Sequence, residues 1–169
     1  LPLRYEDHTR LTPLRQAREG ETLQVEGGVA DSRIELRSRR QLVVKLADDE
    51  GEPLVLRFLN FYPSQQKTLA VGQRVRVLGE LRDGFFGREM VHPTVKSAAT
   101  PLPTALTPIY PSSAQLPQAY LRKAVAGGLA RAALGEVLPP GTVPAGLPAL
   151  REALHFLHEP APGTALATL

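Results

Sequence analysis

The order of the periodic segments in the first 95 residues restricts the fold more than any other feature of the sequence. Five short stretches alternate apolar with polar residues, which is typical of half-buried antiparallel strands. The stretches are residues 22–31, 41–48, 53–61, 73–82 and 88–95. A helical segment separates the third from the fourth, with Pro63 or Ser64 as its start and Gly72 as its stop. This order is that of the OB-fold, a five-stranded Greek-key barrel.

A glycine pair in the first predicted strand supports the barrel. Gly27 and Gly28 interrupt a segment in which Leu23, Val25 and Val29 share one parity. A first strand that pairs on both sides of a small barrel must bend, and glycine permits a bulge at that point. An SH3-like barrel is the main competing fold, but it lacks a helix between its third and fourth strands. We therefore predict a mainly β fold, an OB-fold barrel over residues 1–100.

The sequence changes character near residue 100. Thirty of its 37 charged residues lie in residues 1–100. Residues 101–116 are rich in proline and predict an extended linker. Residues 117–160 contain two short helical segments, which are too small for a core of their own and are expected to pack on the barrel or on another domain. Residues 161–169 form a tail without a clear structural pattern.

The composition argues against several kinds of chemistry. Cysteine is absent, which excludes disulfides and thiolate chemistry and fits a reducing cytoplasm. No phosphate-loop motif occurs, and no apolar run reaches the ~20 residues that cross a bilayer. His155 and His158 lack the further ligands of a four-coordinate zinc site. The acidic run from Asp48 to Glu52 falls in a strand-to-strand turn and is interpreted as a solvated hairpin tip. The sequence thus predicts a binding role, without a metal or cofactor in this chain.

Five of the nine aromatic residues fall in two short clusters. In the first, parity places Phe58 in the core, and it places Phe61 on the outer face, with Tyr62 at the strand end. In the second, Phe85 and Phe86 are adjacent, so alternation predicts one ring inside the barrel and one outside. We take the candidate base-stacking rings to be Phe61, Tyr62, Phe85 and Phe86.

The basic residues lie close to these rings. The net charge is +3, and most of the basic residues are arginine, which makes forked contacts to phosphate and stacks on flat rings. OB-folds bind nucleic acids on the face of strands two and three and on the loops after strands one and four. The candidate phosphate-binding residues in these places are Arg33, Arg37, Arg39, Arg40, Lys45, Arg57, Arg82 and Arg88. An arginine-rich surface without such a role is the competing interpretation.

Several motifs, taken in order, resemble the wedge region of the RecG family of bacterial branch-migrating DNA helicases. They are "LPLRYEDHTR" before the barrel, "LRFLNFY" in the third strand, "GREMVHP" in the fifth, "LTPIYPSS" in the linker, and "YLRKAV" and "LPALREALHFLHEP" in the helices. The sequence departs from the family at Leu59, where a second aromatic residue is common, and at Thr94, where an acidic residue often follows His-Pro.

The resemblance implies a role at DNA junctions. The chain would be a piece of a longer cytoplasmic bacterial protein, and its tail would lead to absent motor domains that use ATP and magnesium, so this fragment would have no ATPase activity. As a monomer it would bind forks and Holliday junctions, and its rings would stack on bases unpaired at the branch point. Two alternatives remain open. The barrel could bind a peptide segment such as that of single-stranded DNA-binding protein, or it could be a structural spacer.

Overall fold

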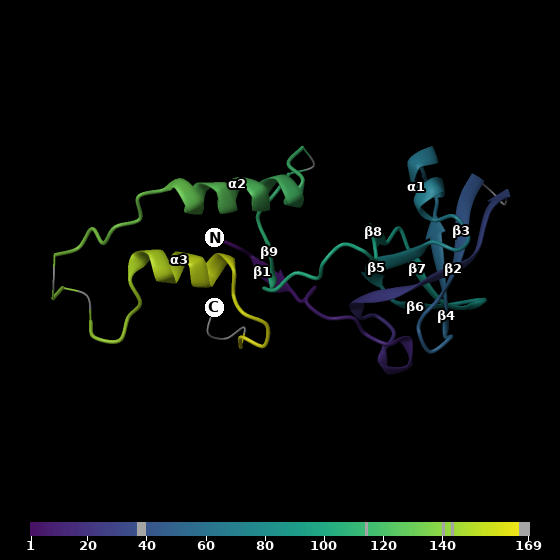
Figure 1. Cartoon of the computed structure of the whole chain (residues 1–169), viewed down its shortest axis with the longest axis horizontal. Helices are drawn as coiled ribbons and strands as arrows, with labels where there is room; N and C mark the ends of the chain where they lie inside the picture. Colours follow the sequence, from purple (N-terminus) through teal and green to yellow (C-terminus); the bar gives the residue numbers. More distant parts are fainter. Residues whose placement is uncertain (37–39, 114, 140, 143, 166–169) are drawn as a thin grey trace. The chain divides into compact units, whose positions relative to one another are not determined.

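The computed structural model describes residues 1–36, 40–113, 115–139, 141–142 and 144–165, which fall into two compact units. The barrel unit is Arg10–Leu102, and the helical unit combines Leu1–Thr9 with Pro103–Leu169 (Figure 1). The sequence-based division differs in two respects, because it assigned residues 1–9 to the barrel and made residues 101–116 a separate linker, which is here divided after Leu102. Residues 1–9 join the helical unit because strand β1 (Arg4–Glu6) pairs with strand β9 (Thr107–Ile109), which lies inside the predicted linker.

The barrel unit is mostly β with a helix after its third strand, as predicted, but its described residues form a sheet of seven strands and not five. Its elements are the 3-10 helix η1 (Leu14–Gln16), strands β2 (Thr22–Leu36), β3 (Arg40–Ala47) and β4 (Pro53–Phe58), helix α1 (Pro63–Thr68), and strands β5 (Arg74–Glu80), β6 (Arg82–Gly84), β7 (Gly87–Val91) and β8 (Thr94–Ser97). The strands lie in the order β6-β7-β4-β3-β2-β5-β8. Helix α1 stands between the third and fourth main strands, which is inconsistent with the SH3-like alternative.

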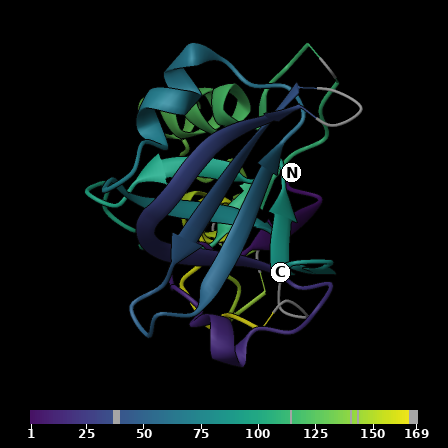
Figure 2. The same cartoon turned by 90° about the vertical axis from the view of Figure 1, so that its right-hand side faces the viewer.

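Two segments close the barrel by pairing on both sides. The long strand β2 pairs with β5 through its first half and with β3 through its second half, and Gly28 takes part in both ladders (Figure 2). The predicted fifth strand is divided in two. Strand β7 pairs in parallel with β4, and β8 pairs antiparallel with β5. His92, at a φ of 50°, and Pro93 separate the two strands, because proline cannot donate to a ladder.

Strand β2 approaches the backbone of β3 closely at Gly27, and the register of the β2–β3 ladder shifts shortly after, between Val29 and Asp31. A Cβ atom at this position would stand 2.3 Å from the carbonyl oxygen of Ala47 and 2.9 Å from its carbonyl carbon. Real Cβ atoms do not approach a backbone so closely, so only glycine fits without moving β3. A Cβ atom at Gly28 would meet nothing within 4 Å.

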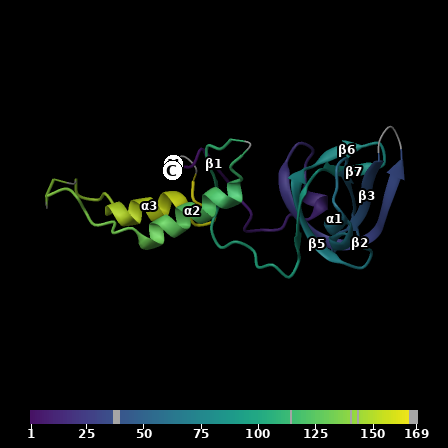
Figure 3. The ribbon, with the colours of Figure 1, turned by 90° about the horizontal axis from the view of Figure 1, so that it is seen from above.

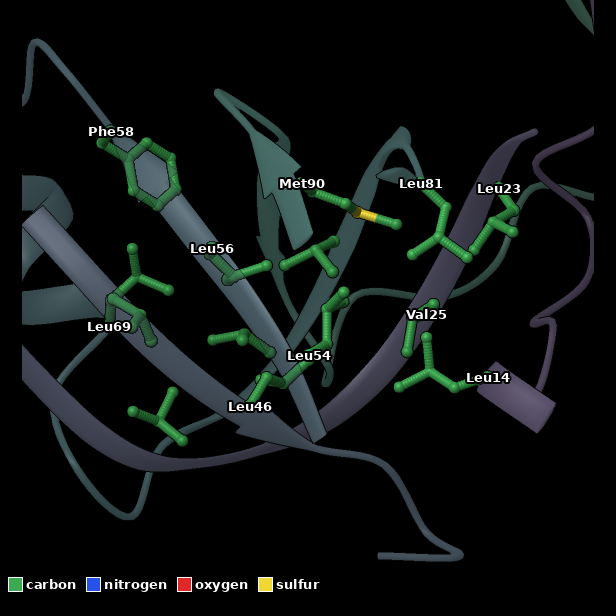
Figure 4. Packing of buried hydrophobic residues seen from close by; sticks show 14 of the residues in the cluster. Leu14, Leu23, Val25, Leu46, Leu54, Leu56, Phe58, Leu69, Leu81 and Met90 are labelled. Atoms are coloured by element: carbon green, nitrogen blue, oxygen red, sulfur yellow. The ribbon is translucent and has the colours of Figure 1, made fainter. Parts of the chain in front are cut away.

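The inner face of the barrel forms one apolar core (Figure 4). Leu54, Leu56 and Phe58 of β4 are buried there, as their shared parity predicts. Leu69, directly after α1, is also fully buried and joins the core cluster. The helix is thereby anchored to the barrel through its last turn.

Arg76 is buried although it alternates with the inward-facing Val75 and Val77. Its guanidinium pairs with Glu26 at 2.9 Å and donates to the carbonyl oxygens of Thr100 and Ala98 at 2.7 and 3.3 Å. The segment after β8 thus covers this part of the outer surface, which strand alternation alone does not reveal.

The helical unit contains α2 (Gln118–Arg131) and α3 (Leu150–His158), which lie side by side (Figure 3). Tyr5 next to β9 donates its hydroxyl to the carbonyl oxygen of Leu157 at 2.6 Å. The Tyr110 ring stacks on the His158 imidazole, and its hydroxyl lies 2.7 Å from Nδ1. Among the described residues, no helix has the length and apolar character needed to cross a membrane.

The two glycines of β2 give a matched pair of variants. We expect Gly27→Ala to lower the free energy of unfolding by about 1–3 kcal/mol, the usual cost of overpacking, because the new methyl group meets the Ala47 backbone. Gly28→Ala should change it by less than about 0.5 kcal/mol. Urea denaturation of both variants measures the difference. Equal losses in the two variants would contradict the close approach at Gly27.

The helical unit should lose stability in mild acid. Burial lowers the pKa of His158, so the folded state favours the neutral imidazole, whose Nδ1 is hydrogen-bonded to the Tyr110 hydroxyl. This contribution is complete above the unfolded value of about 6.5 and is lost as the pH falls through the lower folded value. An NMR titration of the His158 ring protons, repeated in denaturing urea, measures both values. A folded pKa at or above the unfolded one would contradict the assignment.

Candidate nucleic-acid interface

The outward side chains of β2, β3, β4 and β7 make up one surface, here called the outer face. Residues paired across neighbouring strands share a face, so the strand register defines two rows. The first row is Arg33, Val43, Arg57 and Val91, and the second is Asp31, Lys45, Val55 and Glu89. Val43 and Val55 are buried although neither belongs to the core cluster, so the outer face has an apolar floor between charged side chains.

The charges on the outer face are largely paired with one another. Arg33 donates to Asp31 at 3.0 Å and to Glu35 at 2.9 Å. Arg57 donates from Nε to Glu89 Oε2 at 2.7 Å, and the two side chains are only 15% and 19% exposed. Lys45 is exposed and has no carboxylate partner among the described residues. The described part of this face is therefore charge-balanced, which differs from the basic groove that the sequence suggested.

The remaining predicted phosphate-binding residues differ in whether other groups of the protein already bind their side chains. Arg82 pairs with Glu80 at 3.2 Å, and the Arg88 guanidinium donates to the carbonyl oxygen of Leu14. Arg40 lies 5.2 Å from the centre of the Phe61 ring, with no carboxylate partner in the described part of the chain. Arg37 and Arg39 lie outside the described residues. Arg40 and Lys45 are thus the candidates whose charge is available to a ligand.

The first aromatic cluster follows the end of β4. Phe61 is partly buried and packs against the core, whereas the neighbouring Tyr62 is 73% exposed. The expectation that Phe61 is an outward ring was wrong. Strand β4 ends at Phe58, so alternation no longer determines where the following side chains point.

Hydrogen bonds hold the backbone around Tyr62. Its N–H donates to Gln65 Oε1 at 3.0 Å, and its carbonyl oxygen accepts from the Gln65 N–H at 3.0 Å. His92 fixes the end of β4 in a similar way. Its N–H donates to the carbonyl oxygen of Arg57 at 2.8 Å, its Nε2 accepts from the Leu59 N–H at 3.2 Å, and its ring lies edge-on to Phe58. Sequence reasoning missed this role, for which the "HP" dipeptide was the only signal.

The second aromatic cluster is the tip of the β6–β7 hairpin. Gly84 pairs with Gly87, which leaves Phe85 and Phe86 as the two turn residues. They are 93% and 62% exposed and pack edge-to-face, with ring centres 5.0 Å apart. The expectation of one inward ring was wrong, because both residues lie beyond the paired strands. The hairpin projects from the barrel (Figure 1).

The two ring clusters lie at opposite ends of the outer face. Val55 on β4 is level with Glu89 on the parallel strand β7. Tyr62 follows Val55 by seven positions, and Phe85 precedes Glu89 by four. Strand β4 runs three residues beyond Val55 to Phe58, and β7 begins two residues before Glu89 at Gly87, so at about 3.3 Å per residue these two strand ends lie roughly 17 Å apart. The rings thus form two contact points and not one patch.

The acidic turn between β3 and β4 has a structural role. The Asp48 carboxylate accepts from the backbone N–H groups of Leu14, Glu50 and Glu52 at 3.1, 3.0 and 2.8 Å. It thereby joins η1 to the turn. Within the described residues, no group of three or more His, Cys, Asp or Glu side chains is arranged to hold a metal ion.

Comparisons with known proteins point to one family. The profile of the RecG wedge domain matches residues 1–131. The ATP-dependent DNA helicases RecG of Escherichia coli K12 and Haemophilus influenzae are 39% and 35% identical over the whole chain. The chain spans only 25% of the length of each of these relatives. A solved structure of RecG bound to a three-way DNA junction aligns with 95% of this chain and 23% of that chain, with a TM-score of 0.76 at 21% identity.

The different burial of neighbouring rings can be measured as stability. We expect Phe61→Ala to cost about 1–3 kcal/mol of unfolding free energy, because its ring packs against the core. Tyr62→Ala should cost less than about 0.5 kcal/mol, because most of its side chain is in water. Thermal denaturation of the two variants provides the comparison. A larger loss for Tyr62→Ala would contradict this placement of the rings.

Proposed function

The chain belongs to the RecG wedge domain family, and from that premise we propose that it binds branched DNA with the exposed rings at the two ends of its outer face. The observation that carries this proposal is the hairpin tip, where Phe85 is 93% exposed on a tight turn. A large apolar ring held in water on a projecting hairpin is a feature of surfaces that bind a partner. The flat faces of unpaired bases are a suitable partner, since every base can stack on a ring.

The rings would act by stabilising opened base pairs. Opening the pair at a branch point costs a few kcal/mol, and stacking on an aromatic side chain contributes about 1–3 kcal/mol per base. Phe86 packs edge-on against Phe85, which fixes the ring before DNA arrives and reduces the entropy lost on binding. Tyr62 sits on a backbone that Gln65 holds in the same way.

The distance between the two ring clusters favours a branched ligand. A separation of roughly 17 Å between the strand ends that carry the rings spans about five base steps at 3.4 Å each. The hairpin tip and Tyr62 therefore cannot stack on neighbouring bases of one strand. A junction presents unpaired or terminal bases in more than one arm, so each ring cluster would contact a different arm.

Arg40 and Lys45 would supply the phosphate contacts. Neither has a carboxylate partner among the described residues, so each can neutralise a phosphate and release a counterion. Phe61 lies under the Arg40 guanidinium. We therefore assign Phe61 the role of orienting Arg40. Because the Phe61 ring is partly buried against the core, we do not propose it as a stacking ring.

In the longer relatives, a motor would draw duplex DNA past this wedge. The strands would separate where the rings hold the opened bases, so splitting would need no chemistry from the barrel itself. ATP and magnesium would act in the parts of the relatives that this chain does not span. The part played here is to bind the branch point and orient its arms.

Titration with a three-way DNA junction and with linear duplex, at two salt concentrations, tests the proposal. We expect the wild type to prefer the junction, and Tyr62→Ala and Phe85→Ala each to weaken junction binding roughly 5- to 100-fold, as expected for one lost stack. Tyr120→Ala is the matched control, because its ring is 62% exposed on α2 in the helical unit. Equal affinity for both DNAs, or equal loss in the control, would count against the proposal.

A further inference from the structure

We propose that Glu89 masks Arg57 as a phosphate-binding residue, and that the β6–β7 hairpin holds this mask in place. The inference rests on the proposed function, because it requires DNA at the outer face. It adds a mechanism that regulates when the outer face binds phosphate. The pair joins two strands, since Arg57 is on β4 and Glu89 is on β7.

The Arg57 guanidinium is only partly occupied. Its Nε donates to Glu89 Oε2 at 2.7 Å, and its two Nη groups have no protein partner among the described residues. No buried side-chain nitrogen or oxygen in that part of the chain lacks a partner, so the Nη groups reach solvent. Arg57 thus keeps donors available for a ligand while a carboxylate holds its Nε.

A phosphate would compete with Glu89 for the same guanidinium. Carboxylate and phosphate oxygens both accept forked hydrogen bonds from arginine, and a partly buried pair is screened little by salt. A phosphate at Arg57 must displace Glu89 or lie beside its negative charge. Glu89 therefore weakens the binding of any DNA that contacts the outer face alone.

The hairpin determines the position of the carboxylate. A Cβ atom at Gly84 would stand 2.5 Å from the Glu89 carboxyl carbon and 2.6 Å from Oε2, so the carboxylate rests against the bare Gly84 backbone. Phe85 is the next residue. A displacement of the tip when Phe85 stacks on a base would press Gly84 against Glu89 and loosen its contact with Arg57. Tip contact and phosphate contact would then reinforce each other, which favours branched DNA.

Glu89→Gln tests the mask, because glutamine keeps the shape of the side chain and removes its charge. We expect several-fold tighter binding of a three-way junction, a salt dependence steeper by about 0.9 for one added phosphate contact, and reduced preference over linear duplex. Glu80→Gln is the matched control. It removes the same charge from the exposed pair with Arg82 and should produce a smaller gain. Arg57→Gln/Glu89→Gln should gain no more over Arg57→Gln than Glu80→Gln gains over the wild type.

Gly84→Ala provides a second route to the same result, because its methyl group displaces the Glu89 carboxylate without changing the charge. Gly84→Ala should also tighten junction binding. If Glu89→Gln does not fold, Gly84→Ala serves as the test in its place. Wild-type binding with no gain in either variant, or an equal gain in Glu80→Gln, overturns the mask alone. Failure of the wild type and all variants to bind DNA overturns the proposed function and the mask together.

Discussion

The contact of Gly27 with the Ala47 carbonyl is the constraint on which the barrel depends. Next to this contact β2 changes its partner, because it pairs with β5 up to Gly28 and with β3 from Gly28 onward. The divided strand β7–β8 completes the closure through Pro93. Because the strands are then fixed in tilt and register, the outer face, the end of β4 and the hairpin all have set positions. The positions of these surface features are thus linked to the close approach of Gly27 to the Ala47 backbone inside the barrel.

Closure also explains why the rings and the charges are distributed as they are. Apolar side chains with inward parity fill the core, and Val43 and Val55 form a floor for the charged rows outside. Acidic neighbours offset the arginines of the face. The exposed rings are found where the strands stop, at Tyr62 and at the Phe85–Phe86 turn. The exposed rings thus lie at the ends of the face, and most of the described charges between them are paired, with Lys45 as the exception.

The fold was predictable from the sequence to the extent that local periodicity determines it. Alternation identified most of the strands and the burial of Leu54, Leu56 and Phe58, whereas the bulge expected at the glycine pair lies just beyond it, between Val29 and Asp31. Alternation failed where the ladders end, which is why Phe61 and the Phe85–Phe86 pair were misplaced. It also cannot report partners from distant strands, so the Arg57–Glu89 pair and the burial of Arg76 stayed hidden. The pairing of β1 with β9 depends on residues about a hundred positions apart and has no local signal.

The two-residue tip has a consequence for the behaviour of the protein in concentrated solution. A hairpin that carries two apolar rings at the edge of a sheet is a potential site of strand-to-strand aggregation. Here β6 is only three residues long, and Arg82, Asp83 and Arg88 place charges on both arms of the hairpin. Short length and flanking charge are the features that keep natural sheet edges from adding a further strand. The hairpin therefore combines exposed rings with an edge that is short and charged.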